Sequence, residues 1–191
     1  MFFEKGDVSA IGAAGSKLYA RGRGLRSDIS TSLFMNILLS LLFAAATGAC
    51  ARVRVHLPFT PVPVTGQVFA VLMSGAILGP WFGALSQILY VGIGIAGIPW
   101  FAVGPIGPTG GYLVGFVVAP LIIGRLGKRF PAMLAGIAAI YTLGLLQFSI
   151  FTGRGLLASI PLAVLPFIPF DLAKCLIATL VASPFRRMDG R

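Results

Sequence analysis

The most informative side chains in this sequence are Asp171 and Lys174, in the apolar stretch 166–184. At a spacing of three residues they share one helix face, where a carboxylate accepts hydrogen bonds and an ammonium group donates them. Each charge costs at least ~2.5–3.5 kcal/mol at the centre of a bilayer. The pair either neutralises itself or forms a binding site; a site is favoured, because charges inside a membrane by default face a functional cavity.

Three further polar side chains lie in apolar stretches. Gln67 lies about one helical turn into its stretch, so its amide must bond a neighbouring helix or face a ligand. Gln87 and Tyr90 are three residues apart and share a face with Gly94. That face suits either a cavity wall or a close contact with another helix.

Two unusual loops flank these stretches. The loop 58–63 holds three prolines in six residues, which keep its backbone extended. The loop 99–112 is rich in glycine, whose backbone can approach a ligand closely. Within it, Thr109 is placed to cap the helix that follows. We expect both loops to lie over one mouth of the protein.

The composition is that of a membrane protein. Of 191 residues, 57% are apolar and 10% are charged, against about 25% charged in a soluble domain; the mean hydropathy is +0.95. Eight of the 20 charged residues (15 basic and 5 acidic) lie in 1–29 and four in 186–191. These values exclude a soluble enzyme, a disordered chain and, despite a net charge of +10, a nucleic-acid-binding domain.

The hydropathy pattern predicts an all-α integral membrane protein with six transmembrane helices. The six spans are 30–51, 64–79, 81–98, 109–125, 132–151 and 166–184. They divide the chain into a basic N-terminal arm (1–29), a membrane domain (30–185) and a basic tail (186–191).

The lysines and arginines outside the spans predict the orientation. Eleven lie in segments on the side of the two termini, and three, Arg52, Arg54 and Arg154, lie on the other side. Because basic residues favour the cytoplasmic side, both termini are predicted to be cytoplasmic in a multi-pass protein of the cell membrane. Asp171 then lies in the outer third of the bilayer, beneath the two loops.

Residues for metal binding or catalysis are scarce. His56 is the sole histidine, and Cys50 and Cys175 lack a CxxC spacing, so we predict no metal site. The chain also lacks the GxxxxGK[ST] motif that binds ATP phosphates. With one acid and one lysine inside the spans, we predict no enzyme activity and no cofactor.

Small residues recur at a spacing of four in the first span, as the pairs Ala44/Gly48 and Ala45/Ala49. Such pairs flatten a helix face and allow another helix to approach closely. Two interpretations stay open: packing within the chain, or a docking face for another subunit.

Several of these segments, taken in order, resemble the BioY family, the biotin-binding S-components of energy-coupling-factor (ECF) vitamin transporters. The matching segments are Phe59-Thr-Pro-Val-Pro-Val-Thr-Gly-Gln67, Leu78-Gly-Pro80, Tyr90 with Gly94-Ile-Ala-Gly-Ile-Pro99, Gly107-Pro-Thr-Gly-Gly-Tyr-Leu113 with Gly115-Phe116, and Pro169-Phe-Asp-Leu-Ala-Lys174. The likeness spans about residues 33–184 and leaves out the N-terminal arm. The loop between Phe101 and Gly107 is shorter than is usual in the family.

The resemblance implies a six-helix S-component bundle that captures biotin outside the cell. It also implies transport with a transmembrane coupling subunit and two ATPase subunits, although some family members share a module or work alone. The ureido ring of biotin would donate to Asp171 and accept from Lys174, and four residues would close the pocket: Thr109, Gly110, Gly111 and Tyr112. The docking face of the family would correspond to the pairs around Ala45 and Ala49.

Two other functions are weighed against this one. A binding subunit or carrier for another small vitamin would ignore biotin and bind, for example, thiamin or riboflavin. An intramembrane enzyme would need paired acids, a histidine cluster or a serine–base arrangement within the spans, and the sequence has none.

Overall fold

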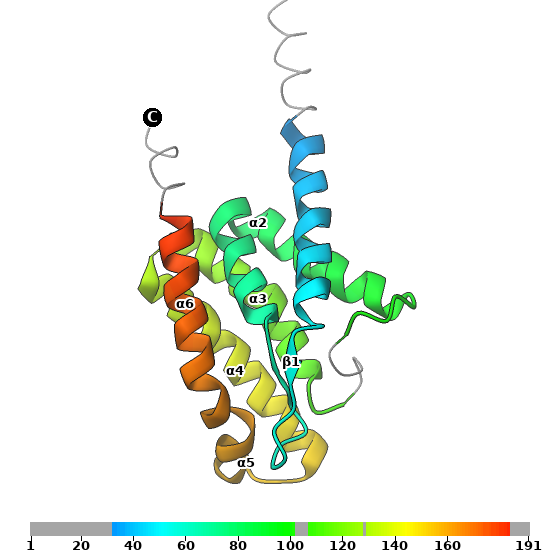
Figure 1. The fold of residues 1–191 in the computed structure, drawn as a ribbon, viewed down its shortest axis with the longest axis vertical. Helices are drawn as coiled ribbons and strands as arrows, with labels where there is room; N and C mark the ends of the chain where they lie inside the picture. Colours follow the sequence, from blue (N-terminus) through cyan, green and yellow to red (C-terminus); the bar gives the residue numbers. More distant parts are fainter. Residues whose placement is uncertain (1–31, 102–106, 128, 184–191) are drawn as a thin grey trace, which may run out of the picture. The chain divides into compact units, whose positions relative to one another are not determined.

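The computed structural model describes residues 32–101, 107–127 and 129–183 (Figure 1). The arm 1–29 and the tail 186–191, predicted as separate segments, lie outside the described residues. The chain divides into two compact units, one ending at Leu38 and one beginning at Leu39. The first unit contributes the initial turns of helix Ser32–Cys50 to the described part.

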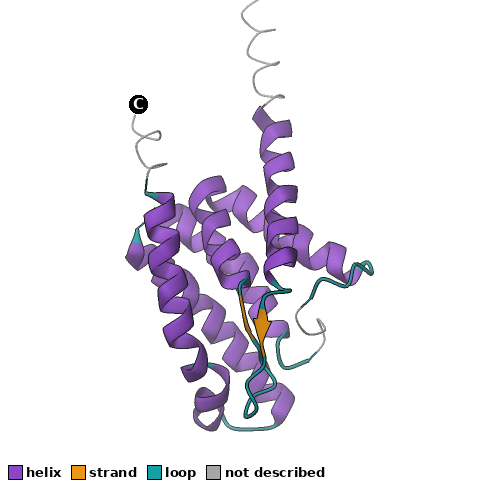
Figure 2. Ribbon diagram, in the orientation of Figure 1, coloured by secondary structure: helices purple, strands orange, loops and turns teal. Residues whose placement is uncertain are grey.

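The second unit consists of helices and one small hairpin (Figure 2). After helix Ser32–Cys50 come β1 (Arg54–Val55), β2 (Val64–Thr65), α2 (Gln67–Ile95), α3 (Gly110–Leu126), α4 (Phe130–Thr152), α5 (Leu156–Ala163), the short 3-10 helix η1 (Leu165–Phe167) and α6 (Ile168–Ala182). Within the described residues, four helical segments are long and apolar enough to cross a membrane, and α3 is apolar but shorter. The predicted class, an all-helical membrane protein, is confirmed.

A sharp bend divides α2 into two halves. Gly79 has φ 76° and ψ −172°, a backbone conformation open to glycine but strained for other residues. Pro80 follows and has no N–H for the helical ladder. The predicted spans 64–79 and 81–98 correspond to these two halves. Gly124 of α3 lies against the bend, where a Cβ atom would overlap the Pro80 backbone.

The region between α4 and α6 differs from the expectation. The sequence predicted a loop between spans ending at 151 and starting at 166, but α5 occupies part of it. Gly153, with φ 67°, ends α4 in a left-handed turn, and the chain re-enters a helix three residues later, at Leu156. Pro161 lies within α5 and Pro166 within η1.

Helix α3 packs against both α2 and α4, and α6 packs against α2 and α4 as well. Their shared core includes Leu72, Phe116, Ile123, Met133 and Ile140, all nearly or fully buried. The hairpin pairs Arg54 with Thr65 and Val55 with Val64, and leads directly into α2. It therefore fixes the entry of α2 beside the N-terminal end of α3.

Candidate functional site

A cavity opens where β2, α2, α3, α4 and α6 meet. Its space is about 590 Å³ including the part open to solvent, within the roughly 300–1,000 Å³ of small-molecule sites. Its polar lining consists of Thr65, Gln67, Tyr90, Thr109, Tyr112, Tyr141, Asp171 and Lys174. Its apolar lining includes Val62, Val64, Val68, Leu113, Phe116, Ile140 and Phe167. Polar groups in a mostly apolar hollow are typical of a specific small-molecule site.

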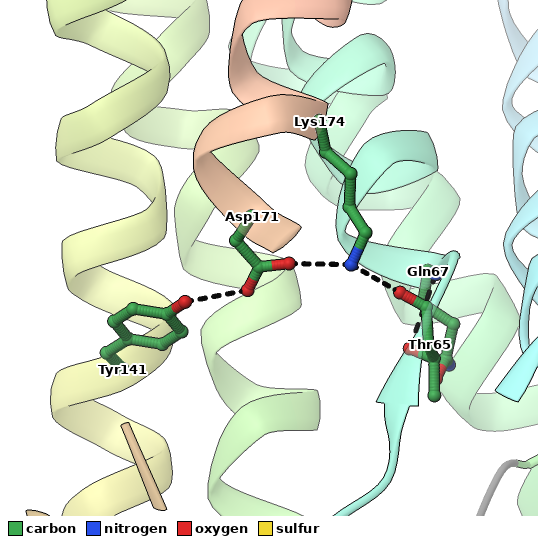
Figure 3. A network of polar contacts seen from close by, with 5 residues as sticks. All are labelled: Thr65, Gln67, Tyr141, Asp171 and Lys174. Atoms are coloured by element: carbon green, nitrogen blue, oxygen red, sulfur yellow. Dashed lines mark hydrogen bonds and ion pairs between the residues drawn. The ribbon is translucent and has the colours of Figure 1, made fainter. Parts of the chain in front are cut away.

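The charged pair forms the centre of the polar lining (Figure 3). The Lys174 ammonium lies 2.7 Å from Asp171 Oδ1 and donates to the backbone oxygen of Thr65 at 2.6 Å. The Tyr141 hydroxyl donates to Asp171 Oδ2 at 2.8 Å. Three separate segments, β2, α4 and the first turn of α6, thus converge on one carboxylate and its partner.

This network has hydrogen-bonding capacity left for a ligand. An ammonium group has one more N–H than the two that Lys174 uses on Asp171 and Thr65. A carboxylate offers about four lone-pair sites, of which the described bonds occupy one on each oxygen. The pair therefore neutralises itself and also presents a donor beside an acceptor at the cavity.

Gln67 and Tyr90 supply a second polar wall from the two halves of α2. The Gln67 Nε2 donates to the Tyr90 hydroxyl at 2.7 Å, and both side chains are buried. The Tyr90 ring contacts Phe101 edge-on at 5.4 Å between centroids, and Trp100 donates from its indole N–H to the Tyr90 carbonyl. Gln67 thus bonds a neighbouring segment and also faces the cavity.

At the start of α3, the predicted pocket residues divide. Thr109 and Tyr112 line the cavity, and the Tyr112 hydroxyl donates to the carbonyl of Ala163. Thr109 occupies the N-cap position, but its side chain makes no capping hydrogen bond. Gly110 and Gly111 are not among the lining residues. Gly111 instead permits the contact between α3 and α4, because a Cβ there would overlap the carbonyl oxygen of Leu143.

Gln87 does not face the cavity, contrary to the expectation for its helix face. It is fully buried, and its Nε2 lies 3.0–3.3 Å from three hydroxyl oxygens, those of Thr47, Ser74 and Ser86. Each hydroxyl donates in turn to a helix carbonyl. Within the described part of the chain, Gln87 Oε1 has no hydrogen-bond partner. Gln87 therefore joins helices rather than binding a ligand from the cavity.

The small residues of helix Ser32–Cys50 divide into two faces. Ala44 and Gly48 are buried, and a Cβ at Gly48 would overlap the ring of Trp100. These two residues pack within the chain, so they cannot belong to a docking face. Ala45 and Ala49 are exposed and remain available to another helix.

Tyr141 and Thr65 are site residues that the sequence reasoning did not single out. Tyr141 is a hydroxyl-bearing aromatic residue inside an apolar span, the same signal that drew attention to Tyr90. Thr65 takes part through its backbone carbonyl, a group present at every position, so no side-chain pattern marks it.

The BioY family profile matches residues 23–191, which is most of the chain. The chain belongs to the BioY family. A probable biotin transporter BioY from Pyrococcus horikoshii is 38% identical over 160 residues, covering 80% of this chain and 94% of the relative. The biotin transporter BioY of Thermotoga maritima is 33% identical over 148 residues, covering 71% of this chain and 87% of the relative.

The fold also has a solved counterpart. The crystal structure of the S-component for biotin from an ECF-type ABC transporter superposes with a TM-score of 0.74, at 22% sequence identity. It covers 82% of this chain and 93% of that protein. The S-component fold implied by the sequence resemblance is therefore confirmed.

Proposed function

We propose that this protein is the biotin-capturing subunit of a vitamin uptake system in the cell membrane. The observation that carries the proposal is the Asp171–Lys174 pair, which lines a largely apolar cavity in a chain whose relatives are named biotin transporters. The protein acts as a transporter subunit without enzyme activity or a cofactor of its own, and biotin is its substrate.

The chemistry of biotin matches the two kinds of lining. Its ureido ring carries two N–H donors and a carbonyl acceptor, which suit the remaining lone pairs of Asp171 and the remaining N–H of Lys174. Its sulfur-containing ring and aliphatic chain suit apolar side chains such as Phe116, Ile140 and Phe167. Gln67, Tyr90, Thr109 and Tyr112 complete the set of polar contacts that we propose for the ligand.

The cavity faces the outside of the cell in this proposal. The chain crosses the membrane six times, the two halves of α2 serving as separate spans on either side of Gly79. Both termini, with the arm 1–29 and the tail 186–191, lie in the cytoplasm. The excess of basic residues on that side supports this orientation.

Binding tests the function directly. Isothermal titration of the purified protein should show biotin binding, with affinity at least about tenfold lower in Asp171→Asn and in Lys174→Ala, because each loses a hydrogen bond to a charged group. Binding of thiamin or riboflavin in place of biotin would contradict the substrate. Unchanged biotin affinity in both variants would contradict the site.

Energy for transport comes from partners: a transmembrane coupling subunit and two ATPase subunits. We propose that the coupling subunit docks on the exposed Ala45/Ala49 face, where small side chains allow close helix contact. Radiolabelled biotin uptake should depend on coexpressed partners and should be lost in Ala45→Leu, with binding intact. The matched control is Ala173→Leu, an exposed alanine of α6. Equal uptake in both variants would contradict this docking face.

A further inference from the structure

Two arginines lie at the end of the helix bundle away from the cavity. Helix α3 begins beside the cavity at Gly110 and carries Arg125 in its last turn, and Arg129 immediately precedes α4. Both side chains are exposed. Asp171 is the sole acidic residue of the described ranges, and it pairs with Lys174. Neither arginine therefore has a carboxylate partner within those ranges.

An exposed tryptophan lies beside one of these arginines. The Arg125 guanidinium carbon is 5.0 Å from the centre of the Trp81 ring, and one N–H of Arg125 donates to the Leu121 carbonyl at 3.2 Å. Trp81 is 69% exposed. Tryptophan is enriched at the level of the lipid headgroups, where its ring meets both apolar chains and water. The contact thus places a cation beside a residue that favours headgroup depth.

Next to the arginines is a hollow lined largely by main chain. It lies between the last turn of the first half of α2 (75–79) and the last turn of α3 (123–127), with Arg129 at its edge. In the last turn of α3, the Ile123 carbonyl accepts from the Gly127 N–H, and the Gly127 carbonyl accepts from the Arg129 N–H. The carbonyls of residues 124–126 have no donor within α3, and Pro80 has no N–H to offer a carbonyl at the end of the first half of α2. The hollow therefore offers acceptors, while the arginines offer donors and positive charge.

We propose that this hollow binds the headgroup of phosphatidylglycerol, an anionic phospholipid with free hydroxyl groups. Its phosphate pairs with Arg125 and Arg129, and its glycerol hydroxyls donate to the helix-end carbonyls. Charge complementarity favours this occupant, since basic groups at a membrane surface attract anionic lipid. A carboxylate or a bare phosphate would leave the carbonyls without donors.

Lipid titration of the delipidated full-length protein, followed by native mass spectrometry, tests the site. Phosphatidylglycerol should bind about 30-fold more tightly than phosphatidylcholine with the same acyl chains. Each arginine is expected to raise the affinity about fivefold, and the two factors multiply. In the double variant Arg125→Gln/Arg129→Gln this preference should fall to about twofold or less. The matched control, Arg154→Gln between α4 and α5, should keep the full preference.

A second pair of lipids tests the carbonyl acceptors. Phosphatidylmethanol has the same phosphate charge but no free hydroxyl, so it should bind about threefold or more weakly than phosphatidylglycerol, for the loss of one hydrogen bond or more. Equal binding of these two lipids would overturn the role of the hollow. An equal loss of preference in Arg154→Gln, or no preference in the unaltered protein, would overturn the site. Far-ultraviolet circular dichroism of each variant verifies that it is folded.

Discussion

The amide side chains of Gln67 and Gln87 lie on the same helix, and both are buried, but their surroundings differ. Gln67 bonds Tyr90 and lines the cavity that holds Asp171 and Lys174. Gln87 lies among three hydroxyl groups away from that cavity; that of Thr47 belongs to helix Ser32–Cys50, and those of Ser74 and Ser86 belong to the two halves of α2. The first cluster has donors and acceptors that face a cavity, whereas the donors of the second bond groups of the helices around it.

The difference shows that a polar residue inside an apolar helix has two uses. Such a residue must find a partner because lipid supplies none. In the sealed cluster of Thr47, Ser74, Ser86 and Gln87, the partners are hydroxyl groups of helix Ser32–Cys50 and of the two halves of α2. In the open cluster around Asp171, a cavity admits a further partner. Substitutions should therefore separate the two: the open cluster controls affinity and the sealed cluster controls stability.

The largest effect is expected when the charged pair is replaced as a unit. Asp171→Leu/Lys174→Met should lower biotin affinity about 100-fold or more, since two hydrogen bonds to charged groups are lost. The same replacement should leave the free energy of unfolding unchanged or raise it. The attraction between two buried charges is little larger than the cost of removing both from water. Titration calorimetry and thermal unfolding measure the two quantities. Lower stability with biotin affinity retained would show that the pair is structural, and would contradict the distinction between the open and sealed clusters.

The Tyr141 hydroxyl is expected to act through Asp171. Tyr141→Phe should weaken biotin binding about tenfold, because Asp171 Oδ2 loses its fixed donor. In an Asp171→Asn background the same change should add little, since residues in one network are not additive. A double-mutant cycle of dissociation constants measures this coupling. Fully additive effects would show that Tyr141 contributes independently of the carboxylate.

The two glutamines provide the direct comparison. Gln67→Leu should weaken biotin binding about fivefold, because the cavity loses a polar wall. Gln87→Leu has the same chemistry but no contact with the cavity, so affinity should stay within about twofold. Titration calorimetry measures the biotin affinity of both variants. Similar losses of affinity in the two would mean that the clusters are not functionally distinct.

The smallest effect is expected in the sealed cluster. Ser74→Ala removes an acceptor of the Gln87 amide and should lower the free energy of unfolding by about 1 kcal/mol, without changing biotin affinity. Ser183→Ala is the matched control: each serine donates to a helix carbonyl three residues earlier at 2.8 Å, but Ser183 is exposed. Chemical denaturation should show a smaller loss for the control. Equal losses of unfolding free energy in Ser74→Ala and Ser183→Ala would show that the sealed cluster does not stabilise the protein.

Much of the fold could be predicted from the sequence, and rather less of the site. Long apolar stretches fixed the helices because lipid requires every backbone group to bond within the helix. The predicted boundary between the spans 64–79 and 81–98 coincides with the break at Gly79. Helix α5 was missed, because Pro161 and Pro166 are equally compatible with a loop and with short helical turns.

By itself, the sequence determined that this is a membrane protein of the BioY family, and that Asp171 and Lys174 share a helix face. The reason is local: hydropathy and a spacing of three residues need no knowledge of the rest of the chain. Tertiary structure decided which other groups meet that pair. The Thr65 carbonyl is 109 positions from Lys174, and Tyr141 is 30 from Asp171. Only the packing of helix faces brings such distant groups together and leaves Gln87 outside the cavity.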